Sequence, residues 1–181
     1  MSDQPATTLS HIGLHCFDRE NMVDFYTRVI GLVETDRGGP EDLVFLSGDP
    51  ERDHHQMGLA PGRAVGQDAG PFLNQISFRV DSLDTLRARA DAVASEGITD
   101  VRQTSHGNAW SIYFPDPEGN IIEVFADSPF YVRQPCRDDL DLSKSNDEIL
   151  AETEALHSKD PEFEPFDEWK AKMAGKTPVG A

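Results

Sequence analysis

The chain has 181 residues, of which 38% are hydrophobic and 27% charged, as expected for a globular domain with a polar appendage. Its 33 acidic and 16 basic residues give a formal net charge of −17, which argues against nucleic acid or anionic lipid as a partner. No apolar run approaches the roughly 20 residues of a membrane helix, and no secretory signal is visible at the N-terminus. Cys16 and Cys136 form no disulfide framework, so we expect a cytoplasmic protein.

A strand followed by a helix occurs twice in the first 130 residues. Residues 11–16 and 75–80 alternate between apolar and polar side chains, as strands do. A helix is predicted after each strand, and the two helices are expected to stop at Gly31 and Gly97. Three short strand candidates follow each helix: 32–35, 43–47 and 55–60, then 101–105, 110–114 and 121–126. The pattern therefore predicts two strand–helix–three-strand modules, at about residues 9–60 and 73–127.

The segment from residue 135 onward is rich in Asp and Glu and poor in β-branched residues. Ser145 is predicted to cap a helix with Glu148 in the capping-box position, and a second helix is predicted from about Pro165 to Met173. Three aromatic residues predict that this segment packs on the preceding domain or on a partner subunit: Phe163, Phe166 and Trp169. We therefore divide the chain into a domain of residues 1–134 and an acidic helical extension of residues 135–181.

Three stretches carry a resemblance to a known family: residues 9–32, 73–78 and 113–125. With the double module, they resemble the vicinal oxygen chelate superfamily of glyoxalases, extradiol dioxygenases, fosfomycin resistance proteins and bleomycin-binding proteins. The third stretch is similar to the last two strands of single-ring extradiol dioxygenases such as catechol 2,3-dioxygenase. The resemblance implies an α+β fold in which paired βαβββ modules form a cupped mixed sheet around a metal ion, with the helical extension added.

The resemblance implies one divalent metal ion, Fe(II) or alternatively Mn(II), bound by His11, Gln75 and Glu123. His11 lies on the polar face of its predicted strand. Glu123 lies in a strand that otherwise reads as buried, where a carboxylate needs a cation or hydrogen-bond donors, and a salt bridge to Arg79 is the alternative. Gln75 stands where ring-cleaving enzymes usually have histidine, so it is a ligand, is replaced by water, or marks a weak metal site.

An acid/base histidine is expected in the pair His54–His55. The resemblance to extradiol enzymes favours His55, whose counterpart acts on the oxygen intermediate. Strand alternation favours the opposite choice, because it directs His54 and Gln56 into the cup if Met57 faces the helix. Gln56 is then a rival, since it lies near the fourth ligand of the glyoxalase pattern.

Tyr113 matches a tyrosine that hydrogen-bonds the substrate hydroxyl or the metal-bound oxygen in extradiol enzymes, so we predict a catalytic role for it. Ring-cleaving relatives place a second histidine a few residues before this tyrosine. Asn108 matches that position best, and His106 lies two residues earlier. This departure weakens the resemblance to ring-cleaving enzymes.

The resemblance implies a metal-dependent oxidoreductase that cleaves a catechol-like aromatic substrate with dioxygen. A redox-neutral lyase or isomerase acting on an enediol-like substrate is the alternative that Gln75 and Gln56 suit. A metal-free binding protein, as in bleomycin resistance, is a third possibility, against which His11 and Glu123 argue. We expect a homodimer, as is common in this family, with neither nucleic acid nor membrane as a partner.

Overall fold

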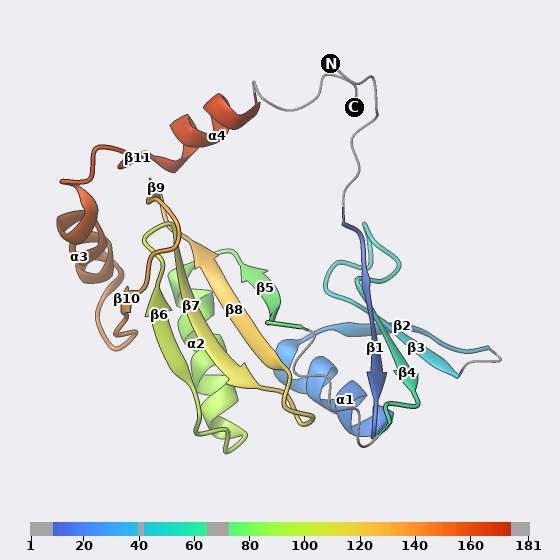
Figure 1. Cartoon of the computed structure of the whole chain (residues 1–181). Helices are drawn as coiled ribbons and strands as arrows, with labels where there is room; N and C mark the ends of the chain where they lie inside the picture. Colours follow the sequence, from blue (N-terminus) through green and yellow to red (C-terminus); the bar gives the residue numbers. More distant parts are fainter. Residues whose placement is uncertain (1–8, 40–41, 65–72, 175–181) are drawn as a thin grey trace. The chain divides into compact units, whose positions relative to one another are not determined.

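The computed structural model describes residues 9–39, 42–64 and 73–174. They divide into two compact units, which we call unit 2 (residues 8–76 and 115–121) and unit 1 (residues 77–114 and 122 onward). Each unit carries one of the two predicted strand–helix–strands modules (Figure 1). The predicted α+β fold with a C-terminal helical segment is therefore confirmed.

Unit 2 contains a four-stranded sheet in the order β1–β4–β3–β2. Its elements are β1 (Ile12–Cys16), α1 (Arg19–Phe25), η1 (Tyr26–Ile30), β2 (Val33–Gly38), β3 (Leu43–Ser47) and β4 (Met57–Pro61). Strands β1 and β4 are parallel, whereas β2–β3 and β3–β4 are antiparallel. Because β4 begins at Met57, two residues later than predicted, His55 lies in the loop before the strand.

The helix of unit 2 begins and ends where the sequence predicts. Asp18 caps its start by accepting a hydrogen bond from the Asn21 amide at 3.1 Å. The last five residues form a π-helix, which the sequence did not indicate. Gly31 ends the helix with a φ of 87°, a left-handed conformation that glycine adopts without steric cost.

Asp116 organises the turn that the family-like motif predicted. Its carboxylate accepts a hydrogen bond from the buried Tyr26 hydroxyl at 3.0 Å and one from the Asn120 amide at 2.8 Å. Glu118, two residues further along this turn, accepts a hydrogen bond from the Asp18 amide at 2.9 Å. The turn therefore holds the helix of unit 2 in place, which is a structural role for the motif.

We expect Asp116→Ala to lower the free energy of unfolding by about 3 kcal/mol, because the buried Tyr26 hydroxyl would lose its ionised acceptor. Urea denaturation measures the change. Asp141→Ala is the matched control, since its exposed carboxylate accepts hydrogen bonds from Ser143 within a local turn. Equal stability of the two variants would show that Asp116 has no special structural role.

Unit 1 contains a five-stranded sheet in the order β10–β6–β7–β8–β5. Its elements are β5 (Ile76–Val80), α2 (Leu83–Ser95), β6 (Arg102–Ser105), β7 (Ala109–Pro115), β8 (Ile121–Asp127) and β10 (Asp138–Asp139). Helix α2 lies along one face of this sheet, as Figure 1 shows. Along β7, Ile112 and Phe114 are directed to one face and Tyr113 to the other, because side chains alternate along a strand.

The C-terminal extension packs on the rest of unit 1 through its aromatic residues. It contains α3 (Asn146–His157), β11 (Glu164–Pro165) and α4 (Phe166–Ala174), and it follows β9 (Phe130–Tyr131) along the chain. The rings of Phe130 and Phe163 lie 5.0 Å apart, and Tyr131 stacks on Trp169 at 4.9 Å. These aromatic residues therefore find partners within their own chain, and the homodimer stays a prediction that they do not support.

Polar contacts connect helix α3 to the rest of unit 1. Its predicted capping box is confirmed, because Ser145 and Glu148 each accept a hydrogen bond from the other's backbone amide. The buried indole of Trp110 donates to the Thr153 hydroxyl at 3.0 Å. Arg87 of α2 donates to two carbonyl groups of the segment that leads into α3, at 2.8 and 2.9 Å.

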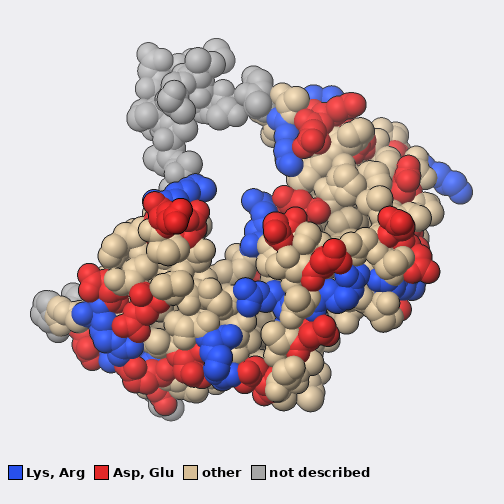
Figure 2. All heavy atoms as spheres, turned by 180° about the vertical axis from the view of Figure 1, so that it is seen from behind, with Lys and Arg blue, Asp and Glu red and all other residues tan. Residues whose placement is uncertain are grey.

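One face of the molecule carries charged side chains of both signs (Figure 2). Acidic and basic side chains are interspersed on the face shown in Figure 2. In unit 2, Arg37 contacts Glu20 at 2.7 Å and Glu34 at 2.8 Å, and these hydrogen bonds hold the pKa of both carboxyl groups below its usual value. Within the part of the chain that the structure describes, every helix is too short or too polar to cross a membrane.

Candidate functional site

Glu123 is a buried carboxylate in the middle of β8, with 7% of its surface exposed. Ser77 of β5 donates a hydrogen bond to its Oε2, and Tyr113 of β7 donates one to its Oε1. Arg79, the alternative partner considered from the sequence, instead contacts Asp127 at 3.4 Å. The burial of Glu123 is therefore compensated by two hydroxyl donors, which also fix the direction of its oxygens.

His106 lies in the turn between β6 and β7 and extends the contacts of Glu123. Its Nε2 is 2.7 Å from the Tyr113 hydroxyl, and its Nδ1 is 2.7 Å from the carbonyl oxygen of Cys136. The next residue, Gly107, has a φ of 72°, and a Cβ atom there would lie 2.6 Å from the Cβ of Val132. Only glycine fits this turn, so the turn fixes the position of His106.

The hydrogen bonds that link His106, Tyr113 and Glu123 determine where the protons of these three groups lie. A carbonyl only accepts, so His106 carries a proton on Nδ1. Tyr113 donates its single hydroxyl proton to Glu123 Oε1, so its oxygen accepts the hydrogen bond from His106 Nε2, which requires a proton on that nitrogen as well. Burial, followed by the hydrogen bond with Glu123 and its charge, raises the pKa of Tyr113 to about 12. The three groups therefore form a path along which a proton can move.

The structure places His106, two residues before Asn108, beside the Tyr113 hydroxyl. Asn108 faces away, and its side-chain oxygen accepts a hydrogen bond from Gln134 at 3.2 Å. His106 takes the position beside Tyr113 because its backbone amide bonds to the Ala109 carbonyl at 2.8 Å and closes a tight turn. A histidine followed by glycine at the end of a strand was the signal that could have identified it.

His11 and His55 lie together in unit 2. Their ring centroids are 4.5 Å apart, and the ring of Phe45 packs 4.7 Å from that of His55. The Nδ1 atoms of His54 and His55 are 3.0 Å apart. Burial, followed by the charges of His11 and His54, lowers the pKa of His55 and favours its neutral form. Unit 2 thus brings together two predicted site residues that are 44 positions apart in the printed sequence.

The two glutamines have different surroundings. Gln56 braces the loop before β4, because its Oε1 accepts a hydrogen bond from the Gly48 amide at 3.1 Å and its Nε2 lies 3.5 Å from Asp53. The strand alternation that would direct Gln56 into the cup does not settle its direction, because β4 starts only at Met57. Gln75 immediately precedes β5, and its Oε1 accepts a hydrogen bond from Asn74 at 3.1 Å.

The chain belongs to the Glyoxalase/Bleomycin resistance protein/Dioxygenase superfamily, whose family model matches residues 8–124. The matched region contains every predicted site residue: His11, His55, Gln75, Tyr113 and Glu123. The extension beyond it, with α3 and α4, lies outside the match.

Two curated relatives and one solved structure illustrate the likeness. The chain is 29% identical over 122 residues to biphenyl-2,3-diol 1,2-dioxygenase 2 of Rhodococcus globerulus, covering 66% of this chain and 62% of the relative. It is 28% identical over 121 residues to a manganese-dependent 2,3-dihydroxybiphenyl 1,2-dioxygenase of Geobacillus genomosp. 3, covering 65% and 36%. A glyoxylase/bleomycin resistance protein/dioxygenase domain from Frankia sp. EAN1pec superposes with a TM-score of 0.55 at 21% identity, covering 68% of this chain and 93% of that one. The match thus spans less than two thirds of either dioxygenase, and the solved structure supports the fold alone.

Proposed function

We propose that the protein is a metal-dependent extradiol-type dioxygenase that cleaves a catechol-like aromatic substrate with dioxygen. The observation that supports this best is the hydrogen-bonded chain His106–Tyr113–Glu123 in unit 1. It joins a candidate metal ligand to a phenol and an imidazole, the groups that proton transfer to and from a diol requires. The two biphenyl-diol dioxygenases among its relatives support the same substrate class.

We propose His11, Gln75 and Glu123 as the ligands of one Fe(II) ion, with Mn(II) as the alternative. An imidazole, an amide oxygen and a carboxylate form a mixed nitrogen and oxygen donor set that suits either ion. The hydroxyl donors of Ser77 and Tyr113 resemble the outer contacts that orient metal-binding carboxylates. When bound, the ion would hold the diol and dioxygen side by side and relay electron density between them.

The remaining residues would then act as proton donors and acceptors. His55, beside His11, would exchange a proton with the reacting oxygen atoms. Tyr113 would donate its hydroxyl proton to a substrate oxygen, and His106 would return a proton to Tyr113 through Nε2. The Cys136 carbonyl would keep the Nδ1 proton of His106 in place throughout.

Gln75 favours the second candidate function, a redox-neutral lyase or isomerase acting on an enediol-like substrate. An amide oxygen is a weaker donor than imidazole, which suits a metal ion that polarises a carbonyl without activating dioxygen. In that case His55 and Tyr113 would move a proton between carbon and oxygen atoms of one substrate.

Oxygen consumption with 2,3-dihydroxybiphenyl and a panel of catechols separates these two functions. We expect the Fe(II)-loaded protein to consume oxygen with at least one diol, and 4-nitrocatechol to change its spectrum on anaerobic binding. If iron-loaded protein neither consumes oxygen nor shifts the 4-nitrocatechol spectrum, the dioxygenase proposal is wrong and the redox-neutral function is favoured.

Gln75→His should tighten Fe(II) binding about 10- to 100-fold, because imidazole is a stronger donor than a neutral amide oxygen. Competition with a chromogenic chelator measures the affinity. Gln56→His is the matched control, because Gln56 braces a loop in unit 2, and it should leave Fe(II) affinity unchanged. Unchanged affinity in Gln75→His would remove Gln75 from the proposed ligand set.

A further inference from the structure

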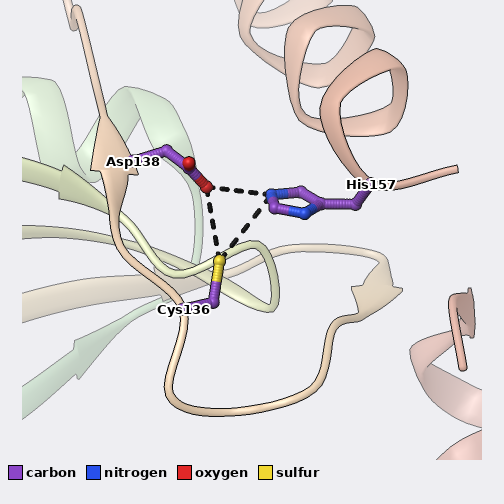
Figure 3. Close-up of side chains that lie close together, drawn as sticks. All are labelled: Cys136, Asp138 and His157. Atoms are coloured by element: carbon purple, nitrogen blue, oxygen red, sulfur yellow. Dashed lines mark hydrogen bonds and ion pairs between the residues drawn. The ribbon is translucent and has the colours of Figure 1, made fainter. Parts of the chain in front are cut away.

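Three potential metal ligands meet in the C-terminal segment of unit 1, and none of them belongs to the ligand set proposed above (Figure 3). Cys136 lies on the segment that leads into β10, Asp138 is the first residue of β10, and His157 ends helix α3. The Cys136 Sγ is 3.3 Å from the Asp138 Oδ2 and 3.8 Å from the His157 Nε2, and those two atoms are 3.0 Å apart. One sulfur, one oxygen and one nitrogen therefore converge on a common point.

This triangle has the size that a tetrahedral zinc ion requires. Bonds of roughly 2.3 Å to sulfur and 2.0–2.1 Å to nitrogen and oxygen place such donor atoms about 3.3–3.6 Å apart. The three observed separations, 3.0, 3.3 and 3.8 Å, bracket this range. The side chain of His157 is 13% exposed and that of Asp138 is 32% exposed, so water can reach a fourth position.

The donor set also selects the kind of ion. A thiolate favours borderline-soft ions, and imidazole with carboxylate completes a set typical of Zn²⁺ rather than Mg²⁺ or Ca²⁺. Without an ion, burial, followed by the hydrogen bond with Asp138 and its charge, raises the pKa of Cys136 to about 12. Binding would break the S–H bond of Cys136, form a sulfur–zinc bond and release the thiol proton to solvent, and the proton that His157 Nε2 shares with Asp138 would also have to leave that nitrogen.

We propose that Cys136, Asp138 and His157 form a second metal site that binds Zn²⁺, with a water molecule as the fourth ligand. The site ties the end of α3 to β10, which pairs with β6. It also fixes the segment whose Cys136 carbonyl holds the Nδ1 proton of His106. The site would therefore hold the C-terminal segment in place. The proposal of a zinc site does not depend on the reaction proposed above.

Cobalt titration of the metal-free, reduced full-length protein tests this proposal, because Co²⁺ replaces Zn²⁺ and reports its ligands by its spectrum. We expect a thiolate-to-cobalt charge-transfer band and intense tetrahedral visible bands that Zn²⁺ abolishes. Both features should be lost in Cys136→Ser and strongly weakened in His157→Gln. Absence of a thiolate band from the wild-type protein would overturn the proposal.

Two control variants separate this site from other sources of signal. Cys16→Ser removes the other free cysteine, which is buried in β1, and should keep the band. Glu123→Gln removes a ligand of the first proposed site and should also keep it, so the two proposals can fail independently. A band that persists in Cys136→Ser but disappears in Cys16→Ser would place the cobalt elsewhere and refute the assignment.

Thermal unfolding gives a second measurement that does not depend on the spectrum. Zn²⁺ should raise the Tm of the wild-type protein but not that of His157→Gln or Asp138→Asn, whose side chains keep hydrogen-bonding groups at these positions. If Zn²⁺ raises the Tm of all three proteins equally, Asp138 and His157 form only an ion pair to which Cys136 is hydrogen-bonded, and the proposal is wrong.

Discussion

Glu123→Gln should lose the Fe(II) or Mn(II) that the wild-type protein binds, and its oxygen uptake with a diol should fall at least about 1000-fold, equivalent to about 4 kcal/mol. Glutamate supplies the only negative charge in the proposed ligand set of His11, Gln75 and Glu123. Glutamine has the same shape, and its side-chain oxygen can still accept the hydrogen bond from Ser77 or Tyr113, so the fold should be kept. Metal analysis after desalting and oxygen-electrode assays measure the two effects.

Glu148→Gln is the matched control for this change, because it removes the same charge from an exposed capping position at the start of α3. It should bind the metal and consume oxygen as the wild-type protein does. Full metal content in Glu123→Gln would show that Glu123 is hydrogen-bonded by Ser77 and Tyr113 for a purely structural reason.

His55→Gln should retain the metal ion but reduce kcat by about 10²- to 10⁴-fold, the usual contribution of a general acid or base. His55 lies against His11 in unit 2, and burial lowers its pKa so that its neutral form can accept a proton. Glutamine keeps hydrogen-bonding capacity but cannot exchange a proton near neutral pH. Steady-state kinetics with the preferred diol should therefore show a change in kcat with little change in KM.

His54→Gln provides the comparison, because His54 is the neighbouring and more exposed histidine. Removal of the His54 imidazole should reduce kcat less than about tenfold, because His54 only contacts the His55 ring through Nδ1 and helps to position it. A larger loss in His54→Gln than in His55→Gln would exchange the roles of the two residues, as the strand-alternation argument had suggested.

Local patterns were enough to predict most elements of the fold. Alternation along β1 and β5, the glycine stops at Gly31 and Gly97, and the Ser145 capping box each depend on nearby residues, so one sequence contains the information. The start of β4 was predicted less well. A strand boundary depends on the hydrogen bonds of the adjoining loop, here those of Gln56 with Gly48, which periodicity does not encode.

The candidate site was predictable only where a family motif marks it. The motif indicated Tyr113 and Glu123. Whether Asn108 or His106 lies beside Tyr113 depends on the tight turn at Gly107, and the conformation of that turn cannot be read from the number of residues between two positions. Cys136 and His157 are 21 positions apart and meet because α3 packs on unit 1. Contacts made by tertiary packing of this kind have no signature in residue spacing.

A Mn²⁺ titration followed by electron paramagnetic resonance tests whether His11 and Glu123 bind the same ion. Mn²⁺ is chosen because hard ions avoid the Cys136 thiol. We predict that the wild-type protein binds one Mn²⁺ tightly, and that His11→Ala, Glu123→Gln and the double variant each lose that same ion. Two tightly bound ions, of which each single variant loses a different one, would show that His11 and Glu123 do not share a metal ion, as would tight binding that survives either substitution.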